Sequence, residues 1–219
     1  MEHRRVHDDR VKAMISRNVV FWEVDTQADF MLPGGKLYVP GAERLLSNLR
    51  RLTDAARERR VFLVSHGCYH PKDDPEFKTF PPHCIKGTEG SAFVPEALAD
   101  KVATVPNEAT AMLPRDLFAY QQILLEKQTL DIFQSRHAAK LLQRFGDDVE
   151  FVVFGVVTEY CVRFAAKGLL DRGRRVSVVQ DAIETLKAEE SQRTVAELKA
   201  LGARFFSTMD ALALLDAAK

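Results

Sequence analysis

The sequence predicts an α/β protein of three layers, in which helices cover both faces of a mainly parallel central sheet. Short apolar runs rich in Val and Phe, typical of buried strands, alternate with longer segments whose apolar residues recur at helical spacing. Repeated strand–helix units make neighbouring strands parallel, because each helix returns the chain to the same edge of the sheet. A chain of 219 residues that is 46% hydrophobic and 28% charged can bury one sizeable core. We therefore expect a charged N-terminal extension at residues 1–17 and a single domain over residues 18–219.

The first half of the chain predicts two strands, one helix and one long loop. Residues 18–24 form an apolar run that stops at Asp25, and residues 61–65 form a second such run. Between them, residues 41–60 are typical of an amphipathic helix with Leu45, Leu46, Leu49 and Leu52 facing inward. Residues 66–90 are rich in Pro, His and Lys, and a loop of that length in a compact domain is usually functional or disordered.

The second half continues the alternation of strands and helices. Residues 120–126 are typical of a strand that ends at Lys127, and residues 137–145 of a helix that Gly146 closes. Beyond residue 170, the pattern predicts a strand at 175–180 that ends in Asp181 and a helix at 188–201 that Gly202 stops. A short strand at 203–207 and a last helix from Met209 follow.

The chain is organised around residues 150–162, where an apolar run at 151–157 stops abruptly and a helix begins. Thr158 is the expected N-cap of this helix, which places Cys161 in its first turn. There the thiol faces unpaired backbone N–H groups and the positive end of the helix dipole, which lower the pKa of a cysteine and can hold an oxyanion. The alternative is that Cys161 is a small buried hydrophobic residue.

Polar side chains follow three of the predicted strands. Asp25 ends the first strand, Lys127 ends the strand at 120–126, and Cys161 follows the central strand. In a parallel sheet, ligands bind beyond the carboxyl ends of the strands, so these three side chains should converge on one edge. Singly, the aspartate is as consistent with a turn and the lysine with a solvated surface. Together, a thiol, a carboxylate that carries its proton and an ammonium have the composition of an activated nucleophile.

Charge and cysteine content exclude several classes of partner and compartment. Thirty-one basic side chains balance thirty-one acidic ones, so electrostatics gives no indication of nucleic acid or of a membrane surface as partner. Three cysteines without a metal-finger spacing indicate free thiols in a reducing compartment. The N-terminus has no apolar leader core and no run is long enough to span a bilayer, so we expect a cytoplasmic protein.

At several separated motifs the sequence resembles the isochorismatase-like cysteine hydrolases, which have a Rossmann-like fold. The motifs are Asp25-Thr26-Gln27-Ala28-Asp29-Phe30, Gly34-Gly35-Lys36-Leu37, Glu126-Lys127 and Gly155-Val156-Val157-Thr158-Glu159-Tyr160-Cys161-Val162, and the stretch Phe80-Pro81-Pro82-His83-Cys84-Ile85-Lys86-Gly87-Thr88 is similar to the nicotinamidase/pyrazinamidase branch. The resemblance implies Cys161 as nucleophile, Asp25 as proton acceptor and donor, and Lys127 as their partner. It also implies a cis peptide between Val156 and Val157, and an oxyanion hole made by the N–H groups of Val157 and Cys161.

The resemblance also implies a metal site, with one departure. Nicotinamidases hold a divalent metal with an Asp-x-His pair and the His of Pro-Pro-His-Cys, and here Cys68 stands at the Asp position beside His70 and His83. These three side chains can form a zinc-like site with an open position, and Glu76 is a candidate to add a carboxylate. The alternative is that both histidines are ordinary loop residues or contact the substrate directly. Four nearby aromatic residues are candidates for a wall around a flat substrate, or plain core: Phe30, Tyr69, Phe80 and Tyr160.

The predicted function is a thiol-dependent amidohydrolase that releases ammonia from a small aromatic amide such as nicotinamide through a thioester. One divalent metal, zinc by preference, and no organic cofactor are expected, and a homo-oligomer is allowed. A metal-free relative acting on a carbamoyl, maleamate-like or ureido substrate is the enzyme alternative. True isochorismatases act on a vinyl ether without needing a thiol, so Cys161 argues against that activity. A non-catalytic binding or scaffold protein on the same fold is the alternative of another class.

Overall fold

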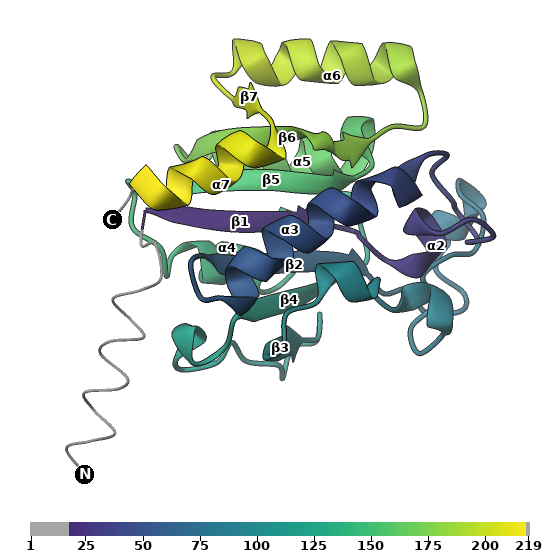
Figure 1. Ribbon diagram of the computed structural model, residues 1–219. Coiled ribbons are helices and arrows are strands. Elements are labelled where there is room, and N and C mark those ends of the chain that lie inside the picture. The colour runs from purple at the N-terminus through teal and green to yellow at the C-terminus, as the bar shows by residue number, and fades with distance from the viewer. Residues whose placement is uncertain (1–17, 218–219) are drawn as a thin grey trace.

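The computed structural model describes residues 18–217, and the predicted extension at 1–17 lies outside the described residues. Within them, seven strands form one sheet in the order β3-β4-β2-β1-β5-β6-β7, and every pairing between neighbours is parallel (Figure 1). The strands are β1 (Val19–Val24), β2 (Phe62–Cys68), β3 (Val102–Val105), β4 (Gln122–Lys127), β5 (Glu150–Val156), β6 (Arg175–Glu184) and β7 (Arg204–Phe206).

Helices cover both faces of this sheet, which confirms the predicted three-layer α/β fold (Figure 1). The helices are α2 (Ala28–Met31), α3 (Leu46–Arg57), α4 (Ala138–Leu142), α5 (Arg163–Leu170), α6 (Ala188–Ala200) and α7 (Thr208–Ala217). Apolar residues of α3 and α7 pack on one face, and those of α4, α5 and α6 pack on the other. None of the helices in residues 18–217 combines the length and the apolar character needed to cross a membrane.

The central strand β1 links the two layers of the core. All six of its residues are buried, because β2 and β5 pair with it on either side and helices cover both of its faces. Alternate side chains enter opposite cores, so Phe21 packs beneath α3 and α7 while Trp22 packs beneath α4 and α5. A strand buried on both faces is mostly apolar, and β1 is apolar except at Glu23, so the strand can be recognised in the sequence.

The structure differs from the sequence-based expectations where packing overrides local pattern. The strand β3 was not predicted, because it lies at the sheet edge with only one of its four residues buried and so has no apolar run. The helix expected at 41–60 begins as a 3₁₀ segment, Ala42–Leu45, and becomes α-helical only from Leu46. Two strands are longer than predicted: β2 continues into the expected loop as far as Cys68, and β6 passes Asp181 to end at Glu184.

Candidate active site

Four side chains meet at the carboxyl edge of four adjacent strands, ordered β4-β2-β1-β5. Lys127 ends β4, Cys68 ends β2, Asp25 directly follows β1, and Cys161 lies in the turn after β5. The register of the sheet places Cys68 directly beside Lys127. All four side chains are buried, with at most 5% of each residue exposed, so their interactions are little weakened by solvent.

Lys127 joins the predicted acid and the predicted nucleophile. Its ammonium nitrogen lies 2.9 Å from Asp25 Oδ2 and donates to Cys161 Sγ at 3.5 Å. Burial alone would lower the pKa of Lys127, but the neighbouring Asp25 and the two cysteines outweigh it and hold that pKa well above its ordinary value. Lys127 is therefore a permanent cation at the centre of the site. The structure brings together the three residues that the sequence selected.

Asp25 is held in an unusual backbone conformation. Its φ of 51° lies in the left-handed region, which residues other than glycine adopt infrequently, although Asp tolerates it better than most. Its N–H donates to the carbonyl oxygen of His66, which continues the pairing of β1 with β2 by one residue. The turn lets the carboxylate face Lys127 rather than continue along the strand. Such outliers gather at functional sites, where surrounding structure compensates their cost.

The turn after β5 carries Cys161 but differs from the predicted capped helix. The peptide bond between Val156 and Val157 is cis, as the family resemblance implied. Thr158 is not the N-cap: it begins a π-helical turn, Thr158–Val162, and its hydroxyl donates to the carbonyl oxygen of Glu184 instead. β6 extends far enough to offer that acceptor, which sequence periodicity did not reveal. The oxyanion hole formed by the N–H groups of Val157 and Cys161 stays a prediction.

Cys68 is a fourth member of the cluster. Lys127 Nζ donates to its sulfur at 2.8 Å, closer than to Cys161, and the Cys68 thiol is 3.8 Å from Asp25 Oδ2. Contact with Cys161 and the charge of Lys127 lower the pKa of Cys68 well below its ordinary value against the opposing effect of burial, whereas contact with Cys68 and burial raise the pKa of Cys161. The pKa of Cys161 is thus raised rather than lowered as its helix position predicted, because contact with Cys68 and burial outweigh the charge of Lys127.

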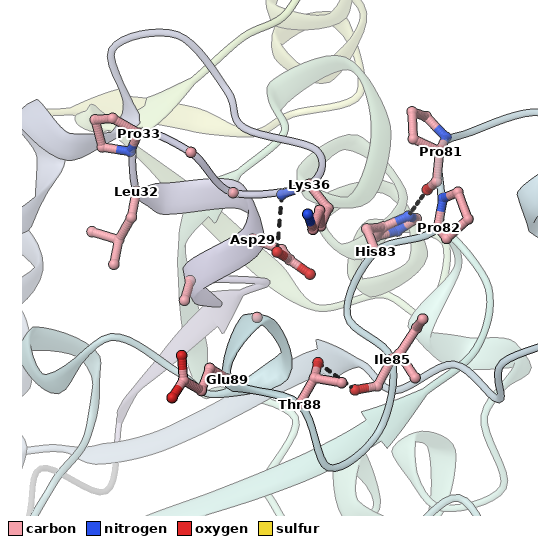
Figure 2. A pocket seen from close by; sticks show the side chains of 14 residues that line it. Asp29, Leu32, Pro33, Lys36, Pro81, Pro82, His83, Ile85, Thr88 and Glu89 are labelled. Atoms are coloured by element: carbon pink, nitrogen blue, oxygen red, sulfur yellow. Dashed lines mark hydrogen bonds between the residues drawn. The ribbon is translucent and has the colours of Figure 1, made fainter.

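Cys68 also belongs to a cluster of metal-ligand type. One ligand atom from each of Cys68, His70 and His83 lies within 4.8 Å of the others, and all three residues are buried. His70 Nδ1 donates to Asp74 Oδ2 at 3.0 Å, and His83 Nδ1 donates to the carbonyl oxygen of Pro81 at 2.8 Å (Figure 2). These hydrogen bonds leave Nε2 of each ring as the free ligand atom, and they are the outer partners that metal-binding histidines typically have.

The donor set fits a zinc ion. His70 Nε2 is buried and has no hydrogen-bond partner, which is otherwise costly. Burial disfavours protonation of this ring, but Cys68 and Asp74 outweigh burial and raise the pKa of His70 to about 9. The raised pKa favours a proton on the His70 ring at the position where a metal ion would bind, and metal binding would displace that proton. Sulfur and imidazole together suit zinc, and Glu76 Oε1, at 4.0 Å from His83 Nε2, offers a nearby carboxylate.

A narrow pocket opens onto Cys161. It is lined by Phe30, Leu37, Cys68, Glu76, Phe80, His83, Leu130, Val157, Tyr160, Cys161 and Leu186. Phe80 and Tyr160 meet edge to face with ring centroids 5.8 Å apart, and Phe30 lies against His83 at 5.2 Å. Three of the four predicted aromatic residues therefore line the pocket. Tyr69 is not among the lining residues, because its backbone pairs with Lys127 and its ring packs in the core.

A second, more open cleft adjoins this pocket and shares His83 with it (Figure 2). It lies between the segments 28–36 and 81–90, which Asp29 holds together. One oxygen of that carboxylate accepts from the N–H of Lys36 at 2.9 Å and the other from the N–H of Cys84 at 2.7 Å. Asp29 thus fixes the loop that presents His83.

Sequence reasoning missed three polar residues that position the site. Gln27 holds the backbone of Cys68 from both sides, accepting from its N–H at 2.7 Å and donating to its carbonyl at 2.6 Å. Asp74 orients His70 through a hydrogen bond. The spacing of a carboxylate four residues after a histidine could have indicated this contact from the sequence. Glu159 accepts from the N–H groups of residues 186 and 187 and from the Thr185 hydroxyl, which fixes the Leu186 wall of the pocket. Nothing local indicated the partners of Gln27 or Glu159.

Comparisons with known proteins agree with this geometry. The model of the isochorismatase domain matches residues 20–210. A nicotinamidase of Escherichia coli (strain K12) is 25% identical over 209 residues, which cover 85% of this chain and 93% of that protein. A nicotinamidase/pyrazinamidase of Mycobacterium tuberculosis is 26% identical over 80% of this chain and 91% of its own length. The crystal structure of the Pyrococcus horikoshii pyrazinamidase in complex with zinc has a TM-score of 0.69 at 27% identity, covering 87% of this chain and 99% of that one.

Proposed function

We infer that this chain, an amidohydrolase that belongs to the isochorismatase family, releases ammonia from a small aromatic amide such as nicotinamide. One observation carries the proposal: a fully buried lysine contacts a carboxylate at 2.9 Å and, at 3.5 Å, a thiol that lines an aromatic pocket. Such a constellation suits nucleophilic acyl transfer, because it combines a nucleophile, a proton carrier and a fixed positive charge.

In the proposed reaction, Cys161 Sγ attacks the amide carbonyl carbon while Asp25 takes up the thiol proton. Lys127 contacts both the Cys161 sulfur and the Asp25 carboxylate, so it can hold the two groups in position. Its positive charge compensates the negative charge whether that charge lies on the sulfur or on the carboxylate. Asp25 then returns the proton to the leaving nitrogen, and ammonia departs as the thioester forms. Water hydrolyses the thioester and regenerates the thiol. The backbone N–H groups of Val157 and Cys161 are the proposed donors to the oxyanion.

Cys68, His70 and His83 are the proposed ligands of one divalent metal, with zinc preferred for their sulfur and imidazole donors. When bound, the ion would supply a positive charge that orients a ring nitrogen or other polar tip of the substrate in the pocket. Phe30, Phe80 and Tyr160 would hold a flat ring by its faces and edges. A cytoplasmic location and an amide substrate in this ring class are part of the same proposal.

A metal-free relative acting on a carbamoyl, maleamate-like or ureido substrate is the second candidate. It is favoured by the 2.8 Å contact between Lys127 and Cys68, because this contact engages one of the three metal donors with the catalytic lysine. Measuring which of these compounds the protein hydrolyses distinguishes nicotinamide from the carbamoyl, maleamate-like and ureido substrates.

Ammonia release from nicotinamide, pyrazinamide, maleamate and N-carbamoyl compounds tests the function. Cys161→Ala, Asp25→Asn and Lys127→Ala are each expected to lower turnover by roughly 10²-fold or more while circular dichroism stays unchanged. Double variants should lose little beyond the single ones, because the three side chains act as one unit. A folded wild-type protein that releases no ammonia from any of these amides would instead support a binding or scaffold role.

A further inference from the structure

Two free thiols meet inside the proposed active site. Cys68, at the end of β2, and Cys161, after β5, line the same pocket. Their sulfur atoms lie 2.8 and 3.5 Å from one nitrogen, Lys127 Nζ, so a single ammonium holds both sulfurs near each other. Residues 93 positions apart in the sequence are thus held as a dithiol by the fold. The third cysteine is separate: Cys84 is buried elsewhere, with its sulfur 3.8 Å from the carbonyl oxygen of Gly90.

We propose that Cys68 and Cys161 form a reversible oxidation site, at which hydrogen peroxide or another small hydroperoxide converts the two thiols to a disulfide. One thiolate attacks a peroxide oxygen and becomes a sulfenic acid as the O–O bond breaks, and the departing oxygen leaves as water. The second sulfur attacks the sulfenic sulfur, the S–S bond forms, and the hydroxyl leaves as a second water. The two cysteines lose two electrons and two protons, and one hydrogen peroxide becomes two waters.

The side chains around the pair support both steps. Lys127 places a positive charge beside each sulfur, and thiolates near a cation are the forms that react with peroxide. The pocket that admits the amide also reaches both sulfurs, and a peroxide is much smaller than an aromatic amide. A nearby second thiol traps a sulfenic acid before further oxidation makes it irreversible. A carboxylate in place of the Cys68 thiol could not do this.

The proposed disulfide excludes two other states of the site. It consumes the sulfur of Cys161, so activity stops; this consequence rests on the proposed function. It also consumes the sulfur of Cys68, which is one of the three metal donors. Disulfide and metal therefore compete, and zinc held by Cys68, His70 and His83 should protect the pair. Thiol reduction is expected to restore both the metal site and the nucleophile.

Peptide mapping reads the bond without relying on activity. Trypsin separates the three cysteines, placing Cys68 in residues 61–72, Cys84 in residues 79–86 and Cys161 in residues 145–163. After treatment of the full-length protein with hydrogen peroxide, we expect one cross-linked species joining 61–72 to 145–163. Alkylation under denaturing conditions should then label one cysteine of three, and dithiothreitol should return all three. Zinc chloride added before the peroxide should slow cross-linking several-fold.

Matched variants make the outcome decisive. Cys84→Ser should give the same cross-link, whereas Cys68→Ser should give none and leave Cys161 as sulfinic or sulfonic acid that dithiothreitol cannot reduce. Wild-type protein in which Cys161 is over-oxidised while Cys68 stays a free thiol overturns the proposal, as does a cross-link that involves residues 79–86. Failure of the proposed function looks different: the reduced protein would form the disulfide normally yet hydrolyse no amide.

Discussion

At the scale of single residues, Glu23 is a carboxylic acid buried within the sheet. It accepts from the Ser65 hydroxyl at 2.6 Å, and burial raises its pKa from 4.5 to about 8 despite that hydrogen bond. Between those two pH values the unfolded chain loses this proton while the folded protein keeps it. The free energy of unfolding should therefore fall as pH rises, by roughly 1 kcal/mol per pH unit. Glu23→Gln, which is neutral throughout, should escape this loss.

Urea unfolding of the wild type and of Glu23→Gln across this pH range measures the effect. The two proteins should be about equally stable near pH 4.5, and the variant should gain progressively up to about pH 8, the raised pKa of the acid. Above that pH the difference should level off, because the acid is then ionised in both states. A stability difference that does not change with pH would mean that Glu23 is already ionised in the folded protein.

Among the secondary-structure elements, the distance between strands β5 and β1 depends on Gly155. Its φ is +116°, and a Cβ atom there would lie 2.0 Å from the backbone carbonyl oxygen of Val24, the residue before Asp25. Gly155→Ala must therefore move one of two central strands, with an expected loss of at least roughly 2 kcal/mol of unfolding free energy. It should also lower amide hydrolysis, because Asp25 and Cys161 follow directly from the two strands that would separate.

Gly173→Ala is the matched control for this substitution. Gly173 also has a positive φ, +72°, but a Cβ atom there meets nothing within 4 Å. Gly173→Ala should lose only the free energy needed to hold a residue with a Cβ atom in the left-handed region, roughly 1 kcal/mol of unfolding free energy. Its rate of amide hydrolysis should be unchanged. Denaturant midpoints of the two variants give the comparison. Equal losses in both would show that the left-handed backbone, and not the approach of β5 to β1, governs Gly155.

At the scale of the whole molecule, the metal-type cluster ties the end of β2 to a loop that starts more than ten residues later. Binding to the folded state alone raises stability by mass action, about 3 kcal/mol at a hundredfold excess over the dissociation constant. For a chain of this size, zinc added to chelator-treated protein should raise the melting temperature by roughly 5–10 °C. His83→Ala should abolish the rise.

Differential scanning fluorimetry measures this shift, and His137→Asn provides its control. His137 lies outside the cluster, with its ring bonded to the carbonyl oxygen of Glu108, so its variant should keep the full zinc response. Each variant is compared with itself in the presence and absence of zinc, which removes any intrinsic effect of the substitution. A wild-type melting temperature that zinc leaves unchanged would count against the metal site and favour the carbamoyl or ureido substrates.

The sequence alone was enough to predict the layers of the fold and the edge of the sheet that carries the site. Buried parallel strands such as β1 and β5 are predominantly apolar, so their approximate limits are visible in the chain. The carboxyl ends of parallel strands share an edge, so Asp25, Lys127 and Cys161 could be expected to meet without knowing any distance. Family resemblance added the cis peptide between Val156 and Val157, which the structure contains.

The way in which neighbouring side chains change the chemistry of those residues is visible only in the packed structure. Periodicity reports that an element is buried, but strand register determines which side chains touch, and it places Cys68 beside Lys127. The same packing brings Cys68 against Cys161, and this contact together with burial raises the pKa of Cys161, opposite to the direction expected from its helix position. The hydrogen bonds of Gln27 to Cys68 and of Glu159 to residues 185–187 join segments 26 to 41 residues apart, so no local pattern encodes them. The edge strand β3 was not predicted because backbone hydrogen bonds to β4 hold it, and such bonds do not require a pattern of apolar side chains.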